Sequence, residues 1–106
     1  MTSKQYCQFW LTCASSKEAA EISRALLEKR LVACVKSVRV SSDYHWQGAI
    51  EEGNEVLLVM ESMLDKFDEA EKLVASMHSY DTFVLQAIPM QRLSAKAQKW
   101  LEGEIA

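Results

Sequence analysis

One stretch of the sequence, residues 32–61, constrains the fold more than any other. From Val32 to Trp46 the side chains alternate with period two, which predicts a β-strand far longer than the usual ~5–6 residues. Gln47-Gly48 can form a two-residue turn, because glycine tolerates the positive φ that such turns require. Residues 49–61 then return as the partner strand. We therefore expect a sheet built around one long hairpin whose far end projects beyond a 106-residue body.

The register of this hairpin predicts an interruption in the pairing of its two strands. If the turn alone sets the pairing, Val40 faces Glu55. One extra residue near Gly53 would pair Val40 with Val56 instead and leave Glu55 free to turn outward. We therefore predict a β-bulge within residues 52–55.

The segments on either side of the hairpin predict two further strands and three helices. Residues 6–12 and 83–88 are rich in apolar and β-favouring residues and predict strands, the second closed by Pro89. Three helices are predicted: one from the Ser15-x-x-Glu18 capping box to about Arg30, one over 63–77 with Ser62 as its cap, and a last one from Ser94 through Leu101. The order βαβ–βαβ plus a terminal helix predicts an α+β, ferredoxin-like antiparallel sheet with two helices on one face, formed by residues 1–106 as a single domain.

Composition and charge argue against several classes of protein. The net charge is −3 with basic residues dispersed, which disfavours nucleic-acid binding. No apolar run approaches the ~20 residues that span a bilayer, and Met1 to Gln5 lacks the features of a signal peptide. The three cysteines form no C-x-x-C pair, which favours reduced thiols over a disulfide framework. We therefore expect a cytoplasmic protein without a membrane or nucleic-acid partner.

The predicted architecture leaves apolar surface without cover. Two helices shield one face of the sheet, while strand alternation places large apolar groups on the other. An exposed face and a long unpaired edge promote aggregation unless something covers them. Further copies of the chain in closed symmetry are the simplest cover. The alternative is a monomer in which the last helix lies over the face.

Cys13 is the candidate ligand for a soft metal. It follows the first strand and precedes the first helix, where the helix dipole should favour its thiolate. The alternative is an inert small residue at a strand end. Cys7 and Cys34 lie within predicted strands and are expected to be core thiols.

His78 is the second candidate ligand. It ends the second predicted helix just before Ser79-Tyr80-Asp81, so His, Tyr and Asp could form a polar nook in one loop. The alternative is a histidine that caps the helix and interacts with its dipole. We interpret His45 as a surface or packing residue. No H-x-x-x-H, H-E-x-x-H or paired C-x-x-C spacing indicates a preformed zinc site.

Enzymatic interpretations find little support. Acyl-phosphate hydrolysis on this fold would need a glycine-rich loop with an arginine after the first strand, and residues 13–16 contain neither. Ser15 and Ser16 have no histidine near them in the sequence. No organic cofactor is indicated. We expect a protein that is not an enzyme.

Several motifs of this chain match those of a known protein family at fixed spacing, and the hairpin motif is the most specific. The matching residues are Thr12-Cys13; Leu31-Val32-Ala33-Cys34-Val35; Ser42-x-Tyr44-x-Trp46-x-Gly48-x-Ile50-Glu51 with Glu55 following; His78-Ser79-Tyr80-Asp81; and Pro89 with Trp100-Leu101. On these residues the chain resembles the CutA divalent-cation-tolerance family over nearly its full length.

The resemblance implies a PII-like homotrimer in which long hairpins pack against neighbouring subunits. It implies a non-enzymatic role in tolerance of copper or other divalent metals. Carried over by position, Cys13 is the soft-metal thiol, while Tyr44, Trp46, His78 and Tyr80 match residues around an intersubunit cleft, to which we add Asp81.

This sequence departs from the family pattern at two places. Phe83-Val84 stands where the family usually has Pro-Glu, and Met60-Glu61 stands where a lysine is common. The cleft therefore lacks a carboxylate and a cation. Three functions follow as hypotheses. The first is a metal-binding tolerance protein, and the alternative is a PII-like sensor that binds a small ligand in its clefts and signals to a partner protein. The third is a purely structural trimeric scaffold.

Overall fold

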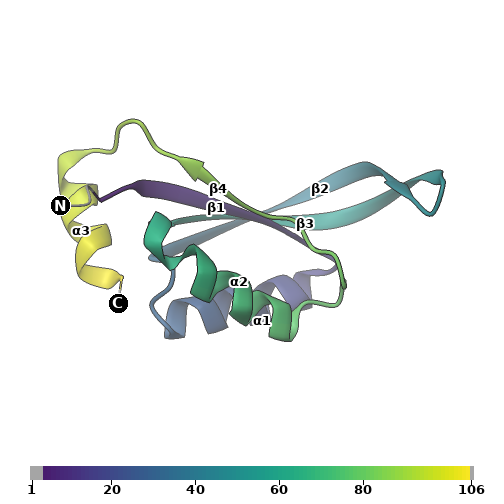
Figure 1. The fold of residues 1–106 in the computed structure, drawn as a ribbon, viewed down its shortest axis with the longest axis horizontal. Coiled ribbons are helices and arrows are strands. Elements are labelled where there is room, and N and C mark those ends of the chain that lie inside the picture. The colour runs from purple at the N-terminus through teal and green to yellow at the C-terminus, as the bar shows by residue number, and fades with distance from the viewer. Residues whose placement is uncertain (1–3, 106) are drawn as a thin grey trace.

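The computed structural model describes residues 4–105, which fold into a four-stranded sheet with helices (Figure 1). In chain order the elements are β1 (Tyr6–Cys13), α1 (Ser16–Glu28), β2 (Cys34–Trp46), β3 (Ala49–Met63), a 3₁₀ turn (Leu64–Lys66), α2 (Phe67–Met77), β4 (Leu85–Pro89) and α3 (Ala95–Glu104). The strand order is β2-β3-β1-β4 and every pairing is antiparallel. The predicted α+β, ferredoxin-like fold is confirmed.

The core lies between the sheet and the two helices that cover one of its faces (Figure 1). Alternate residues of β1 supply its centre, because successive side chains of a strand point to opposite faces. Cys7, Phe9, Leu11 and Cys13 have no exposed surface, and Ile22 of α1 and Val74 of α2 pack onto them. The opposite face carries no helix among the described elements, and α3 lies at the end of the sheet near the N-terminus.

The hairpin of β2 and β3 is continuous, so the predicted bulge is wrong. Pairing runs from Cys34 with Glu61 to Trp46 with Ala49 without a skipped residue. Ordinary alternation already turns Val56 toward the helices, and Val56 is only 7% exposed. An inserted residue would move it away from the core, since a one-residue slip exchanges the two faces of a strand.

The turn of the hairpin has the predicted chemistry. Gln47 has a φ of 48° and Gly48 a φ of 81°. Positive φ at both central residues matches the type I′ turn, whose twist suits the strands that it joins. The turn therefore fixes the register along the whole ladder.

The predicted start of the second helix is wrong. Ser62 does not cap a helix: it is buried in β3, and its hydroxyl donates to the Leu31 carbonyl at 2.6 Å. β3 continues to Met63 because Met63 pairs with Tyr6 of β1, so α2 begins only at Phe67.

Two smaller predictions also need correction. The last strand begins at Leu85 rather than residue 83, because its pairing with β1 begins at Leu85 and ends at Pro89. Ser94 stands at the N-terminal cap of α3, but its side chain makes no capping hydrogen bond. None of the helices within residues 4–105 combines the length and apolar character needed to cross a membrane.

Candidate functional site

The exit of β1 places Cys13 beside the start of α1. Ser15 caps α1 as predicted, since its Oγ accepts a hydrogen bond from the Glu18 N–H at 3.1 Å. The Glu18 carboxylate folds back over this turn and accepts a hydrogen bond from the Ala14 N–H at 2.9 Å. The capping box therefore brings a carboxylate to the residues next to Cys13.

The end of α2 places a histidine, His78, near Cys13 and Glu18. His78 is the C-terminal cap of α2, and its side chain is fully buried. Its Nδ1 accepts a hydrogen bond from the Tyr80 N–H at 3.0 Å, and its Nε2 lies 2.9 Å from the Thr12 carbonyl oxygen. The ring also stacks on Phe83 at a centroid distance of 5.4 Å. The imidazole is thus held in one orientation.

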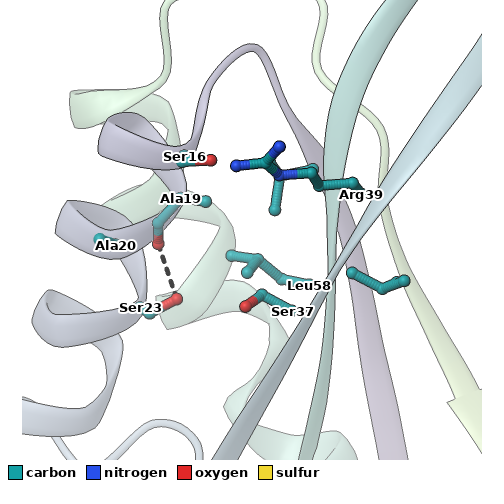
Figure 2. Close-up of a pocket in the computed structure, with 9 residues that line it drawn as sticks. Ser16, Ala19, Ala20, Ser23, Ser37, Arg39 and Leu58 are labelled. Atoms are coloured by element: carbon teal, nitrogen blue, oxygen red, sulfur yellow. Dashed lines mark hydrogen bonds between the residues drawn. The ribbon is translucent and has the colours of Figure 1, made fainter.

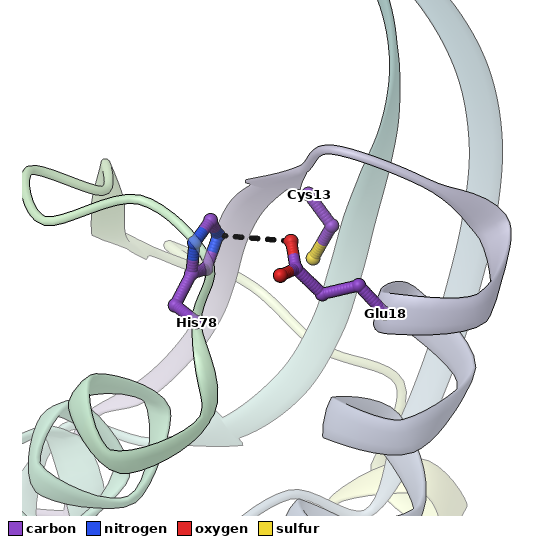
Figure 3. Close-up of side chains that lie close together, drawn as sticks. All are labelled: Cys13, Glu18 and His78. Carbon is purple, nitrogen blue, oxygen red and sulfur yellow. Dashed lines mark ion pairs between the residues drawn. The ribbon is translucent and has the colours of Figure 1, made fainter.

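Cys13, Glu18 and His78 form one cluster (Figure 3). Their ligand atoms all lie within 4.8 Å of one another, and His78 Nε2 is 3.8 Å from a Glu18 carboxylate oxygen. The other Glu18 oxygen accepts a hydrogen bond from the Ser79 N–H at 2.7 Å. A sulfur, an imidazole nitrogen and a carboxylate are a donor set that divalent and soft metals use in proteins.

The predicted effect of the helix dipole on Cys13 is wrong. Burial, followed by the carboxylates of Glu18 and Glu55, raises the pKa of the Cys13 thiol to about 12. Desolvation and like charge both disfavour a thiolate, and here they outweigh the dipole. A metal ion at Cys13 must therefore displace the thiol proton.

Glu18 itself stays ionised at neutral pH. Burial alone would raise the pKa of its carboxyl, but hydrogen bonds from Ala14 and Ser79 and the nearby His78 hold the pKa below its ordinary value. This carboxylate ties the start of α1 to the loop after α2.

Tyr80 connects the cluster to the hairpin. Its hydroxyl donates to a Glu55 carboxylate oxygen of β3 at 2.9 Å. Burial, this hydrogen bond and the charge of Glu55 raise the pKa of Tyr80 to about 12. Of the other residues predicted to line a cleft, Tyr44 and Trp46 are exposed along β2, and Asp81 is exposed in the loop after α2.

Glu18 and Glu55 were not identified from the sequence as members of this site. The signal for Glu18 was available, because a capping-box glutamate must reach back to the residues before its helix. The signal for Glu55 was not, since its contact with Tyr80 joins residues 25 positions apart.

Two adjoining cavities lie between α1 and the hairpin, and neither is lined by Cys13, Glu18 or His78. The first has a volume of about 230 Å³ and contains the Ser16, Ser23, Ser37 and Arg39 side chains, with Arg39 extending toward Ser16 (Figure 2). The second has a volume of about 480 Å³ and reaches Ala14 and Glu55. Open space therefore comes to the residues next to the buried Cys13.

The fold and the cluster together define a class: a small α+β protein with a ferredoxin-like sheet, a long hairpin and a Cys-Glu-His group suited to a metal ion. The model of the CutA1 divalent ion tolerance protein family matches residues 7–104, and the chain belongs to this family.

Relatives in sequence and in structure agree with this assignment. The divalent-cation tolerance protein CutA of Archaeoglobus fulgidus is 36% identical over 96 residues, which are 91% of this chain and 94% of the relative. Protein CutA of Mus musculus is 34% identical over 93 residues, and the match spans only 52% of that longer protein. A solved structure of the divalent cation tolerance protein from Thermus thermophilus has a TM-score of 0.92 at 29% identity, covering 95% of this chain and 99% of that one.

One structural relative corrects the expected location. The solved CutA of Archaeoglobus fulgidus, described as a periplasmic divalent cation tolerance protein, has a TM-score of 0.93 at 33% identity and covers 95% of this chain and 99% of its own. The prediction of a cytoplasmic protein is contradicted by this relative. Cysteine spacing and the N-terminal residues were insufficient to assign a compartment.

Proposed function

We propose that this chain binds copper or another divalent metal through Cys13 and His78 and contributes to metal tolerance without catalysing a reaction. The observation that carries the proposal is the cluster in which Cys13, Glu18 and His78 place their ligand atoms within 4.8 Å of one another. The family's name, divalent ion tolerance, supports a role with metals.

The donor atoms favour a soft ion. A thiolate and an imidazole suit copper, and copper in its reduced state prefers sulfur ligands. The ligand atoms of Cys13 and His78 lie within 4.8 Å of each other, so one ion could be held by both. Glu18 already accepts two backbone hydrogen bonds and serves as a positioning group for the pair.

We propose further that the working form is a homotrimer. Two observations support several copies: β2 and β4 are the edges of the sheet, and the helix-free face leaves Val38 51% and Ile88 37% exposed. Trp46 and Ile50 are also exposed at the far end of the hairpin. In such an assembly Tyr44, Trp46, Tyr80 and Asp81 would line clefts between subunits. Native mass spectrometry at micromolar concentration should give three times the chain mass, and a single chain would refute the trimer.

Titration calorimetry with copper tests the metal site. Cys13→Ser should weaken binding at least tenfold, because it removes the sulfur ligand. The matched control is Cys34→Ser, which changes a partly buried thiol on β2 outside the cluster and should bind as the parent does. Equal binding by all three proteins would refute the site.

A thermal-shift screen separates this function from its alternative. A ligand that binds the folded chain raises its melting temperature according to concentration and affinity. Stabilisation by copper supports the metal site. Stabilisation by small anionic metabolites and by no metal would support a PII-like sensor instead.

A further inference from the structure

The side-chain nitrogen and oxygen atoms of His78 and Glu18 already have hydrogen-bond partners within the chain. Within residues 4–105, no buried side-chain nitrogen or oxygen lacks a partner. A backbone N–H can only donate, so the Tyr80 N–H fixes His78 Nδ1 as an acceptor. The neutral ring then carries its proton on Nε2, which donates to the Thr12 carbonyl.

A metal at either ring nitrogen is incompatible with this set of hydrogen bonds, so binding must rearrange them. A metal at Nδ1 would take the lone pair that now accepts from Tyr80. A metal at Nε2 would move the ring proton to Nδ1, where it would meet the Tyr80 N–H as a second donor. In both cases the hydrogen bond between His78 and the Tyr80 backbone is lost, which frees the loop at Tyr80 to move.

The Tyr80 side chain carries that movement to the hairpin. Its hydroxyl holds Glu55, which is the residue of β3 just before the buried Val56. Glu55 pairs with Val40 of β2, so it stands where the hairpin leaves the covered part of the sheet. The Tyr80–Glu55 hydrogen bond is the direct link between the loop of the cluster and this position.

We propose that the His78–Tyr80–Glu55 contact is a switch: it is closed in the metal-free chain, and metal binding at Cys13 and His78 opens it and loosens the base of the hairpin. This inference rests on the proposed metal site. Linkage adds a second consequence, because a bond that exists only in the metal-free state opposes binding. Removing the Tyr80 hydroxyl should therefore strengthen metal binding.

The experiment uses Cu(I) under anaerobic conditions, with affinity measured by competition against a chromogenic chelator. Tyr80→Phe keeps the backbone N–H and the ring but removes the hydroxyl, and it should bind Cu(I) roughly fivefold more tightly than the parent, as expected from one hydrogen bond. The matched control is Tyr6→Phe, which removes a Tyr–Glu hydrogen bond to Glu102 far from the cluster and should leave the affinity unchanged.

Amide hydrogen exchange provides the second readout. In the parent chain, Cu(I) should speed exchange of residues 52–58 about fivefold. In Tyr80→Phe those residues should exchange at the faster rate without metal, and Cu(I) should add nothing.

The outcomes separate the switch from the site. Tight Cu(I) binding with unchanged exchange at residues 52–58, or a Tyr80→Phe variant that binds no better than the parent, would overturn the switch and leave the metal site standing. No Cu(I) binding by the parent would overturn the proposed function and this inference together.

Discussion

The two halves of the β2–β3 hairpin share one uninterrupted register but differ in what surrounds them. In the covered half, residues 55–63 of β3 alternate between buried and partly buried positions under α1 and α2. In the far half, residues 41–54, which we call the ribbon, all but Ser42 and Gly53 are exposed. The ladder of backbone hydrogen bonds therefore continues beyond Val56, where the core ends.

This difference shows that strand pairing and core burial are separate contributions. Burial of apolar side chains stabilises the covered half by roughly 25 cal/mol per Å² of apolar surface. The ribbon lacks this contribution, and an isolated two-stranded hairpin is only marginally stable in water. Its order depends on the tight turn at one end and on the covered half at the other.

The largest difference in stability should come from shortening one aliphatic side chain in each half of the hairpin to alanine. Leu58 is fully buried and Ile50 is 75% exposed. Leu58→Ala should lower the free energy of unfolding by about 3–5 kcal/mol through lost burial and a residual cavity. Ile50→Ala should lower it by less than about 0.5 kcal/mol in a single chain, and by more only where a neighbouring copy covers Ile50, as in the proposed trimer. Denaturant unfolding followed by circular dichroism measures both.

The same pair of variants can break the comparison. An Ile50→Ala loss that matches that of Leu58→Ala and grows with protein concentration would show that a second copy buries the ribbon. Equal losses at every concentration would contradict the division into two halves.

A smaller effect is expected outside the hairpin, at the Glu18 carboxylate of α1. Glu18→Gln can no longer accept both backbone hydrogen bonds and should cost about 1–3 kcal/mol at pH 7. The folded pKa of Glu18 lies below its ordinary value of 4.5, so this stabilisation is complete above about pH 4.5 and is lost as pH falls through the folded pKa. The measurement is unfolding of parent and variant between about pH 3 and about pH 7, roughly the range in which a carboxyl with a lowered pKa titrates.

The control for this variant lies on the same helix. Glu21→Gln affects a carboxylate that is 59% exposed and 4.0 Å from Lys17. It should change stability by less than about 0.5 kcal/mol. A difference between Glu18→Gln and the parent that stayed constant down to the lowest pH would contradict the role assigned to the carboxylate.

The smallest effect is expected at the tip of the ribbon. Gln47 adopts a φ of 48°, which asparagine tolerates better than glutamine. Gln47→Asn should therefore stabilise the chain by at most about 0.5 kcal/mol. Gly48→Ala places a β-carbon at a φ of 81° and should destabilise by about 1 kcal/mol. Thermal melts show whether each variant is more or less stable than the parent. A stabilising Gly48→Ala would contradict the assigned turn.

The sequence sufficed for the elements that depend on local pattern. The alternation before Gln47-Gly48 predicted the hairpin, and the Ser15-x-x-Glu18 spacing predicted the cap of α1. Features that depend on distant partners were missed. β3 extends to Met63 because Tyr6 pairs with it, and Ser62 is buried because the Leu31 carbonyl lies opposite its hydroxyl.

The same distinction holds for the candidate site: local pattern predicted some of its features, and features that depend on distant residues were missed. Cys13 and His78 were identified from their places at element ends, and the structure brings them together. The predicted direction of the shift in the Cys13 pKa was wrong, because neither the burial of Cys13 nor the approach of Glu55 can be read from local pattern. The trimer, its cleft residues and the single domain remain predictions.

The unbroken pairing of β2 with β3 also limits how the length of this hairpin can change. A single residue inserted into one strand has no bulge to absorb it, so it would exchange the two faces of the strand from that point to the turn. Lengthening or shortening by whole pairs, one residue on each strand next to Gln47-Gly48, keeps every inward side chain inward. Natural and engineered variants of this chain should therefore differ in hairpin length by even numbers of residues.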